Sequence, residues 1–241
     1  MTSANYDVNI YRYNPEVDSK PRVENYSIDP KKIKGIMLLD LLEAIKSQDP
    51  SLAYRRSCAH GVCGSDGLNI NGKNSLACLT KLKDLPKKIT IRPLPGMPVV
   101  RDLIIDMDRF YKQYESIKPF LQAKEKPLQE GEYLQSPEER DKLNGLYECI
   151  LCACCSTACP SFWWNPDKFV GPAGLLWACR FIVDSRDMST EERLKDLQGL
   201  WRLYRCHNIM NCTNVCPKGL NPNKAIHTIQ EQISKDSNSH N

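Results

Sequence analysis

The pattern of apolar and polar positions divides the chain into a strand-rich first part and a helix-rich second part. Residues 8–13 and 88–92 are short runs of β-branched or aromatic residues bounded by Pro or Asn, which is typical of strands. Between them, residues 37–45 repeat apolar side chains on one helical face, and Asp49-Pro50 predicts where that helix ends. Strands with one helix laid across them predict a small α+β domain.

Helix signals dominate the rest of the chain. Apolar periodicity predicts helices over residues 105–120 and 137–147. A capping box at Ser189 and Glu192 predicts the start of another helix, and Asn221-Pro222 predicts the start of the last one. The expected core positions of the helix after the capping box are leucines, namely Leu194, Leu197 and Leu200.

The Pro/Gly-rich stretch 92–98 marks the exit from the first part. We therefore expect two domains, residues 1–106 and 107–241, with a mobile linker rich in Lys, Glu and Gln at residues 122–136.

Composition and charge narrow the function classes. The chain has 241 residues, of which 41% are hydrophobic, and this proportion is normal for a globular protein with a buried core. A net charge of +4, without a Lys/Arg cluster interleaved with aromatics, argues against a nucleic-acid partner. The acidic residues among the first thirty positions do not fit a signal or transit peptide, so we expect a bacterial cytoplasmic chain or a mature imported one.

The most apolar window spans residues 169–183. It has 15 residues and includes Pro172 and Arg180, so it is too short and too polar to cross a bilayer. Docking of the chain on a membrane remains compatible with this.

Twelve cysteines in a reducing compartment indicate metal or redox chemistry rather than disulfides. In the second half, four of them follow the spacing of the bacterial ferredoxin motif and end in Cys-Pro: Cys149, Cys152, Cys155 and Cys159. A second run repeats the offsets of this motif, with Ile209 in place of its second cysteine: Cys206, Cys212 and Cys216.

In the ferredoxin motif the fourth cysteine of each run binds the cluster of the other run. The first three cysteines together with Cys216 would then hold a [4Fe–4S] cluster. Cys159, Cys206 and Cys212 would hold a second cluster, and the aliphatic Ile209 cannot bind a fourth iron there. The sequence therefore predicts a [3Fe–4S] cluster, whose three thiolates favour a high potential.

Zinc is the alternative, because Cys-x2-Cys pairs are common zinc ligands. Zinc requires four ligands for each ion, and seven interlocked cysteines with two Cys-Pro endings do not divide in that way. The spacing favours iron–sulfur clusters over zinc.

The first half carries a plant-type [2Fe–2S] spacing at Cys58, Cys63 and Cys78, with Asp66 where the motif has a cysteine. We expect Asp66 to be the fourth ligand, since a dinuclear cluster needs four; the alternative is a loop aspartate that bonds to its own turn. Three glycines would let the loop fold tightly around the cluster, namely Gly61, Gly64 and Gly67. Two cysteines are left over: Cys154, expected to point away from the ligands, and Cys179, expected in the core.

With these three sites, the chain closely resembles the iron–sulfur subunits of succinate dehydrogenase (respiratory complex II, succinate:quinone oxidoreductase). The most specific stretches are RRSCAHGVCGSDGLNINGKNSLAC, YECILCACCSTACPSFWWNPDKF and RCHNIMNCTNVCPKGLNP. Most members of the family have cysteine at the position of Asp66, and a bacterial subset has aspartate.

The resemblance implies an α+β chain in which a plant-ferredoxin-like β-grasp domain precedes an all-helical bacterial-ferredoxin-like domain. It implies a flavoprotein subunit with FAD, one or two membrane anchor subunits, and haem b on the partners. It places the chain peripherally on the cytoplasmic face of the bacterial inner membrane, or on the matrix face in mitochondria. It also implies a ubiquinone pocket beside the [3Fe–4S] cluster at six positions: Pro160, Ser161, Trp163, Trp164, His207 and Ile209.

The side-chain chemistry agrees with several of these positions. The indole N–H of Trp164 can donate to a quinone carbonyl, Trp163 suits a membrane interface, and His207 can donate to a haem propionate or deliver protons. The alternatives are that Trp163 and Trp164 are ordinary core residues and that His207 has only a structural role.

The predicted function is the transfer of single electrons from FAD through the [2Fe–2S], [4Fe–4S] and [3Fe–4S] clusters to ubiquinone. No dinucleotide fingerprint and no nucleophile triad is found in the sequence, so the substrate site is expected on a partner. The same subunit of a fumarate reductase working with menaquinone is the nearest alternative, and a free ferredoxin-like carrier is another.

Overall fold

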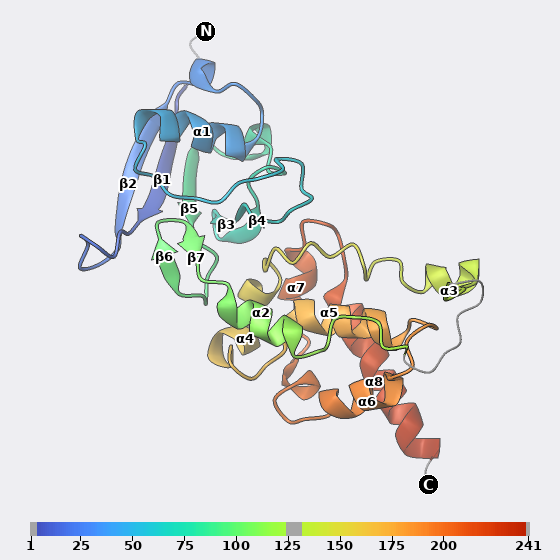
Figure 1. The fold of residues 1–241 in the computed structure, drawn as a ribbon. Coiled ribbons are helices and arrows are strands. Elements are labelled where there is room, and N and C mark those ends of the chain that lie inside the picture. Colours follow the sequence, from blue (N-terminus) through green and yellow to red (C-terminus); the bar gives the residue numbers. More distant parts are fainter. Residues whose placement is uncertain (1–3, 124–131, 240–241) are drawn as a thin grey trace. The chain divides into compact units, whose positions relative to one another are not determined.

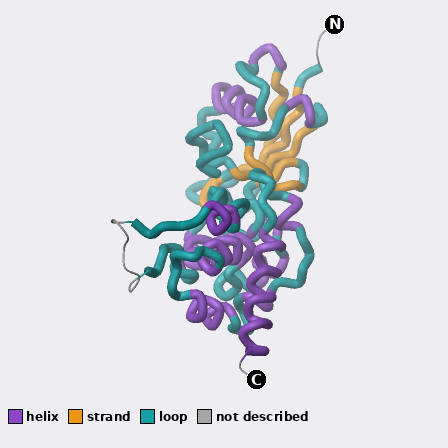
Figure 2. Tube along the Cα trace, turned by 90° about the vertical axis from the view of Figure 1, so that its right-hand side faces the viewer, coloured by secondary structure: helices purple, strands orange, loops and turns teal. Residues whose placement is uncertain are grey.

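The structure is a computed structural model that describes residues 4–123 and 132–239. Its chain forms two compact units, one made of residues up to Met107 together with Ile150–Ala158, the other of Asp108–Cys149 and the chain from Cys159 onward. The named strands all belong to the first unit, and the α-helices after α1 belong to the second (Figures 1 and 2).

The bounds of the elements of the first unit are β1 Tyr6–Arg12, β2 Arg22–Ile28, α1 Leu38–Gln48, β3 Gly67–Ile70, β4 Lys73–Leu76, β5 Lys88–Arg92, β6 Val99–Arg101 and β7 Ile104–Ile105. The bounds in the second unit are α2 Asp108–Glu115, α3 Pro137–Asp141, α4 Pro160–Trp164, α5 Gly171–Ile182, α6 Thr190–Leu197, α7 Asn211–Asn214 and α8 Pro222–Ser239.

The first unit contains a five-stranded sheet in the order β2-β1-β5-β3-β4. β1 and β5 are parallel, and the other neighbouring strands are antiparallel. Helix α1 lies across one face of the sheet (Figure 1), and its buried leucines share the core with Val8 and Ile10 of β1. The predicted strands and the helix ending at Asp49 are confirmed, so the N-terminal part is a sheet domain.

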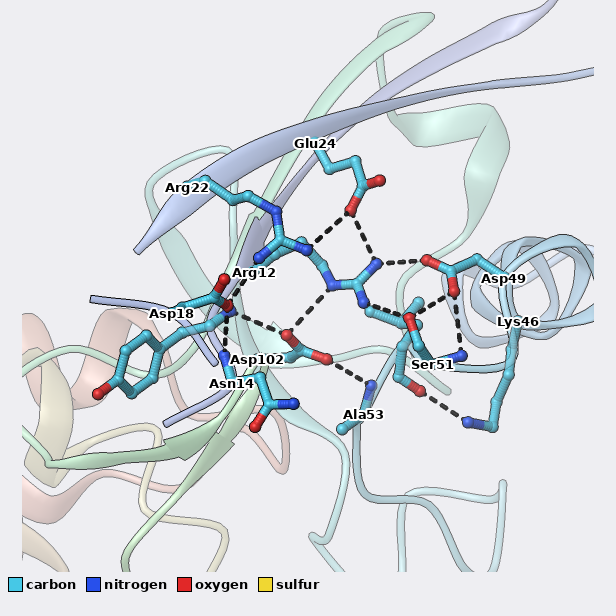
Figure 3. A network of polar contacts seen from close by, with 12 residues as sticks. Arg12, Asn14, Asp18, Arg22, Glu24, Lys46, Asp49, Ser51, Ala53 and Asp102 are labelled. Carbon is cyan, nitrogen blue, oxygen red and sulfur yellow. Dashed lines mark hydrogen bonds and ion pairs between the residues drawn. The ribbon is translucent and has the colours of Figure 1, made fainter. Parts of the chain in front are cut away.

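A charged residue occupies the last core-facing position of β1. Arg12 follows Tyr6, Val8 and Ile10 in the alternation of the strand and is only 3% exposed. Its Nε donates to Oδ1 of the buried Asp102 at 3.1 Å, and other guanidinium nitrogens contact Glu24, Asp49 and Ser51 (Figure 3).

Asp102 completes this network through the backbone. Its carboxylate accepts the N–H of Tyr13 at 2.9 Å and that of Ala53 at 2.8 Å (Figure 3). The network fixes the end of β1 to the chain segments before the [2Fe–2S] loop and after β6. A buried ion pair of this kind is tolerated because each charge has several hydrogen-bond partners.

The second unit is built around α5. This helix is the apolar window of the sequence and is buried on almost all sides, as expected of a helix without a polar face. It packs against α2, α6 and the long α8. The second part of the chain is therefore helical, as predicted.

Two helix predictions were wrong in extent. The helix expected over residues 105–120 is α2, which stops at Glu115, because Lys118 has a positive φ and precedes a proline. The helix expected over 137–147 ends at Asp141, and Gly145 follows with a φ of +81°. Residues 124–131 of the predicted linker lie outside the described residues.

The capping box predicted at Ser189 is absent. Ser189 is the N-cap of α6, but its side chain makes no capping hydrogen bond, and Glu192 pairs with Lys118. Leu194 and Leu197 are buried as predicted, whereas Leu200 lies beyond the end of α6 and is exposed.

Candidate iron–sulfur sites

The loop between α1 and β3 is folded around the thiol of Cys58. Its Sγ accepts backbone N–H groups from His60, Val62 and Cys63 at 3.3–3.4 Å. Positive φ values at Gly61 and Gly64 allow the tight turns that aim these donors at one sulfur. Donors of this kind stabilise a thiolate, which is the form that binds iron.

Cys63 lies in the same loop and is polarised by a neighbour. Its Sγ is 3.2 Å from the hydroxyl of Ser65, and this hydrogen bond is the first cause that lowers the pKa of Cys63, to about 6. The thiolate is therefore available near neutral pH.

Asp66 and Cys78 form a buried pair on the other side of the loop. Asp66 is 3% exposed; its Oδ2 accepts the N–H of Cys78 at 2.6 Å, while Oδ1 is buried with no hydrogen-bond partner in the described part of the chain. Burial, and then the hydrogen bond to Asp66, raises the pKa of the Cys78 thiol to about 12. A buried carboxylate oxygen without a partner is costly, and a metal ion is one ligand that would satisfy it.

The residues present thus fit a [2Fe–2S] cluster in two pairs. Cys58 and Cys63 are hydrogen-bonded to one another through the backbone, and Asp66 and Cys78 likewise. Each pair supplies two donors, which is the number that each iron of a dinuclear cluster needs from the protein.

In the second unit, three predicted ligands line one small hollow that is partly open to solvent: Cys159, Cys206 and Cys212. Cys159 caps α4 and Cys212 lies in α7. Burial raises the pKa values of Cys206 and Cys212, and the nearby thiol of Cys159 raises both further. Iron binding would therefore release protons from these thiols.

Four of the six predicted quinone-pocket residues line the same hollow, namely Pro160, Ser161, His207 and Ile209. Trp163 and Trp164 of α4 are not among its lining residues; they are 38% and 79% exposed. The loop carrying Ile209 is tightly turned, since Asn208 and Met210 both have positive φ, and Asn223 of α8 donates to the Asn208 side chain at 3.0 Å.

The ligands predicted for the [4Fe–4S] cluster are divided between the units. Cys152 and Cys155 belong to the first unit, whereas Cys149 and Cys216 belong to the second. Their common ligation therefore stays a prediction.

The two spare cysteines are both buried. Cys179 lies on α5 and is buried in the hydrophobic core, as predicted, and burial raises the pKa of its thiol to about 12. Cys154 was expected to point away from the ligands, but its thiol is hydrogen-bonded to Cys152 and lowers the pKa of that residue.

Across residues 4–123 and 132–239, no three His, Cys, Asp or Glu side chains converge closely enough to hold one metal ion. The preference for clusters over zinc rests on the spacing of the cysteines in the sequence.

Two polar residues near the first site were not predicted. Ser65 contacts Cys63, and Asn74 of β4 is buried against the segment 154–157. Neither stands out in the sequence, because Ser and Asn are frequent in loops and hairpins; only the alternation of Asn74 with the buried Leu76 marks it as inward-facing.

Among the described residues, none of the helices is both long and apolar enough to span a bilayer.

Comparison with known proteins finds two iron–sulfur domain families in the chain. Residues 7–112 match the family of 2Fe-2S iron-sulfur cluster binding domains, and residues 148–221 match the 4Fe-4S dicluster domain family. The chain is 57% identical over 230 residues to the succinate dehydrogenase iron-sulfur subunit of Coxiella burnetii, covering 95% of this chain and 97% of that one.

Two further relatives extend the similarity. The chain is 52% identical over 226 residues to the succinate dehydrogenase iron-sulfur subunit of Paracoccus denitrificans, covering 93% of this chain and 86% of that one. Its structure is similar to a chain of the Mycobacterium smegmatis Sdh1 complex in the apo form, with a TM-score of 0.87, 25% identity and 97% of each chain covered. Because more than half of its residues are identical to two such subunits over nearly its whole length, the chain belongs to the family of succinate dehydrogenase iron–sulfur subunits and is an electron-transfer subunit of that enzyme.

Proposed function

We propose that the chain carries electrons one at a time from the FAD of a flavoprotein subunit to ubiquinone, through [2Fe–2S], [4Fe–4S] and [3Fe–4S] clusters in that order. Oxidation of succinate to fumarate releases two electrons and two protons. Reduction of the quinone to the quinol takes up two electrons and two protons. The clusters supply one-electron redox centres, and the residues of this chain bind and insulate them.

The first cluster is assigned to Cys58, Cys63, Asp66 and Cys78. The three N–H groups at the Cys58 sulfur and the unpartnered buried Oδ1 of Asp66 support this assignment. The ligands of the second are assigned by spacing alone as Cys149, Cys152, Cys155 and Cys216.

The third cluster is assigned to Cys159, Cys206 and Cys212, and the hollow that these residues share with Ile209 carries the proposal. An aliphatic side chain stands where a complete cubane would need a thiolate. With one thiolate fewer, this site holds less negative charge than a four-thiolate site and favours a higher potential, which suits the last carrier before the quinone.

Quinone reduction is assigned to the surface around this hollow. Pro160, Ser161, His207 and Ile209 line it, and the exposed Trp163 and Trp164 follow on the same short helix. Exposed indoles suit a contact with membrane anchor subunits, because they combine an apolar face with one hydrogen-bond donor.

We propose a β-grasp first domain, a bacterial-ferredoxin-like second domain, and a peripheral position on the cytoplasmic face of the membrane.

Substitution of Ile209 by cysteine tests the assignment of the third cluster. Ile209→Cys supplies the missing thiolate, so the complex should lose its three-iron EPR signal, gain one iron at this site, and reduce quinone more slowly. Ile209→Val keeps an aliphatic side chain and should leave the signal unchanged. A three-iron signal of equal size in both variants would contradict the assignment.

A further inference from the structure

One face of the β3–β4 hairpin is buried where a hairpin would ordinarily face water. Leu68 and Ile70 of β3 point into the core of the sheet. Because strand residues alternate, Asn74 and Leu76 of β4, which pair with Asn69 and Gly67, point to the opposite face. Asn74 is nevertheless only 3% exposed and Leu76 is fully buried.

The segment Ile150–Ala158, which belongs to the same unit as the hairpin, contacts this face. The Asn74 Nδ2 donates to the carbonyl oxygen of Cys154 at 3.0 Å and to the hydroxyl of Thr157 at 3.1 Å. Its Oδ1 accepts from Asn69 at 2.8 Å, so the amide is bonded on both sides. A buried amide with all its partners fixes the position of the groups that it binds.

Two glycines bring the same segment against the backbone of the [2Fe–2S] loop. A Cβ on Gly64 would lie 2.8 Å from the Cβ of Cys152 and 2.9 Å from the carbonyl oxygen of Ile150. A Cβ on Gly67 would lie 3.1 Å from the carbonyl oxygen of Cys152. The approach at Gly64 excludes a side chain, and the approach at Gly67 admits a methyl group only if its neighbour shifts, so the two loops are in backbone contact.

We propose that Asn74 is a positioning residue that holds the segment around Cys152 at a fixed short distance from the [2Fe–2S] loop, and thereby sets the rate of electron transfer between the first two clusters. This inference rests on the proposed function. The step is the transfer of one electron, which oxidises the first centre and reduces the second, with no proton moved. Electron tunnelling slows steeply with distance, so a small displacement of this segment has a large effect on the rate.

The Asn74→Asp variant in the purified complex tests this role. Aspartate has the same size, but it presents an oxygen instead of an N–H donor to the carbonyl oxygen of Cys154. We expect the EPR signals of both clusters to remain, the enhancement of [2Fe–2S] spin relaxation by the reduced [4Fe–4S] cluster to weaken, and turnover to fall about tenfold. A residue that only stabilised the fold would lower cluster content without changing the relaxation of the clusters that remain.

Asn25→Asp is the matched control. Asn25 makes an equivalent amide hydrogen bond, to Asn9 at 3.0 Å, but on an exposed pair of strands in the same sheet. Relaxation and turnover should match those of the unchanged complex.

A steric variant keeps the test decisive if Asn74→Asp does not assemble. In Gly67→Ala the added methyl group must displace the Cys152 carbonyl by a few tenths of an ångström, and the spin relaxation should change in the same direction. Full cluster signals with unchanged relaxation would overturn the inference while leaving the proposed function intact. Absence of either signal from the unchanged complex would instead overturn the proposed function, and the inference with it.

Discussion

Asp66 is the residue at which this chain departs from an all-cysteine [2Fe–2S] site. Its Oδ1 is buried without a hydrogen-bond partner among the described residues, and its Oδ2 is held by the N–H of Cys78. A loop aspartate that served only its own turn would use both oxygens in that turn. The geometry therefore favours the ligand role over the turn role.

Substitutions at Asp66 should separate these roles. Asp66→Ala removes the fourth donor and should weaken or abolish the [2Fe–2S] EPR signal, whereas Asp66→Cys should preserve it. Equal signals in the two variants would show that Asp66 is a loop residue.

Substitution of Arg12 tests how much the buried ion network of the first unit contributes to stability. Arg12→Met leaves Asp102 buried without its charged partner, and we expect the free energy of unfolding to fall by about 3 kcal/mol. The control is Arg22→Met, because Arg22 is half exposed and its ion pair with Asp18 should contribute less than about 1 kcal/mol. Equal shifts of the urea midpoint in the two variants would contradict this role for the network.

At the scale of elements, two Ser-x-x-Glu sequences behave differently. Ser136 accepts the N–H of Glu139 at 3.2 Å and the Glu139 carboxylate accepts the N–H of Ser136, so a capping box forms at α3. Ser189 has the same spacing to Glu192 but makes no capping hydrogen bond.

Alanine at the two serines should reveal this difference. Ser136→Ala should destabilise the first turn of α3 by about 1 kcal/mol, whereas Ser189→Ala should have little effect on α6. Amide hydrogen exchange in each first turn measures both. Greater loss of protection at α6 than at α3 would contradict this difference between the two serines.

The stability of the second unit depends on pH through the buried carboxylate of Asp184, which follows α5. Burial tends to raise the pKa of Asp184, but hydrogen bonds from Arg186, at 2.9 and 2.8 Å, outweigh it and lower the pKa. Because the folded-state pKa is below the ordinary value of about 4, the stabilisation is complete above that value and is lost as the pH falls through the folded-state pKa.

Acid unfolding of the Asp184→Asn variant should therefore depend less on pH below about 4 than that of the unchanged chain. Urea midpoints measured from pH 3 to pH 7 would show this. Parallel pH profiles for the two proteins would mean that Asp184 does not contribute.

These elements also show what the sequence can predict. Periodicity located α1, β1 and β5, because each has a strong apolar pattern. It did not reveal that Arg12 faces inward, since the side chains that neutralise Arg12 come from distant segments. Helix ends were misjudged where a single residue such as Lys118 or Gly145 adopts a positive φ.

At the scale of the whole molecule, cysteine spacing predicted the grouping of Cys159, Cys206 and Cys212 in one hollow. Spacing could not show that the segment Ile150–Ala158 belongs to the same compact unit as the sheet. That association depends on Asn74 and on the bare backbone at Gly64 and Gly67, and such contacts leave no periodic signal.

The central claim is that this chain holds one dinuclear, one complete cubane and one three-iron cluster. Iron analysis combined with variable-potential EPR on the purified complex measures this directly. The expected result is about nine iron atoms per chain, two, four and three in the respective clusters, with three separate signals and the three-iron signal titrating at a higher potential than the [4Fe–4S] signal. About ten irons without a three-iron signal, as one dinuclear cluster and two complete cubanes would give, or zinc in place of iron, would contradict the claim.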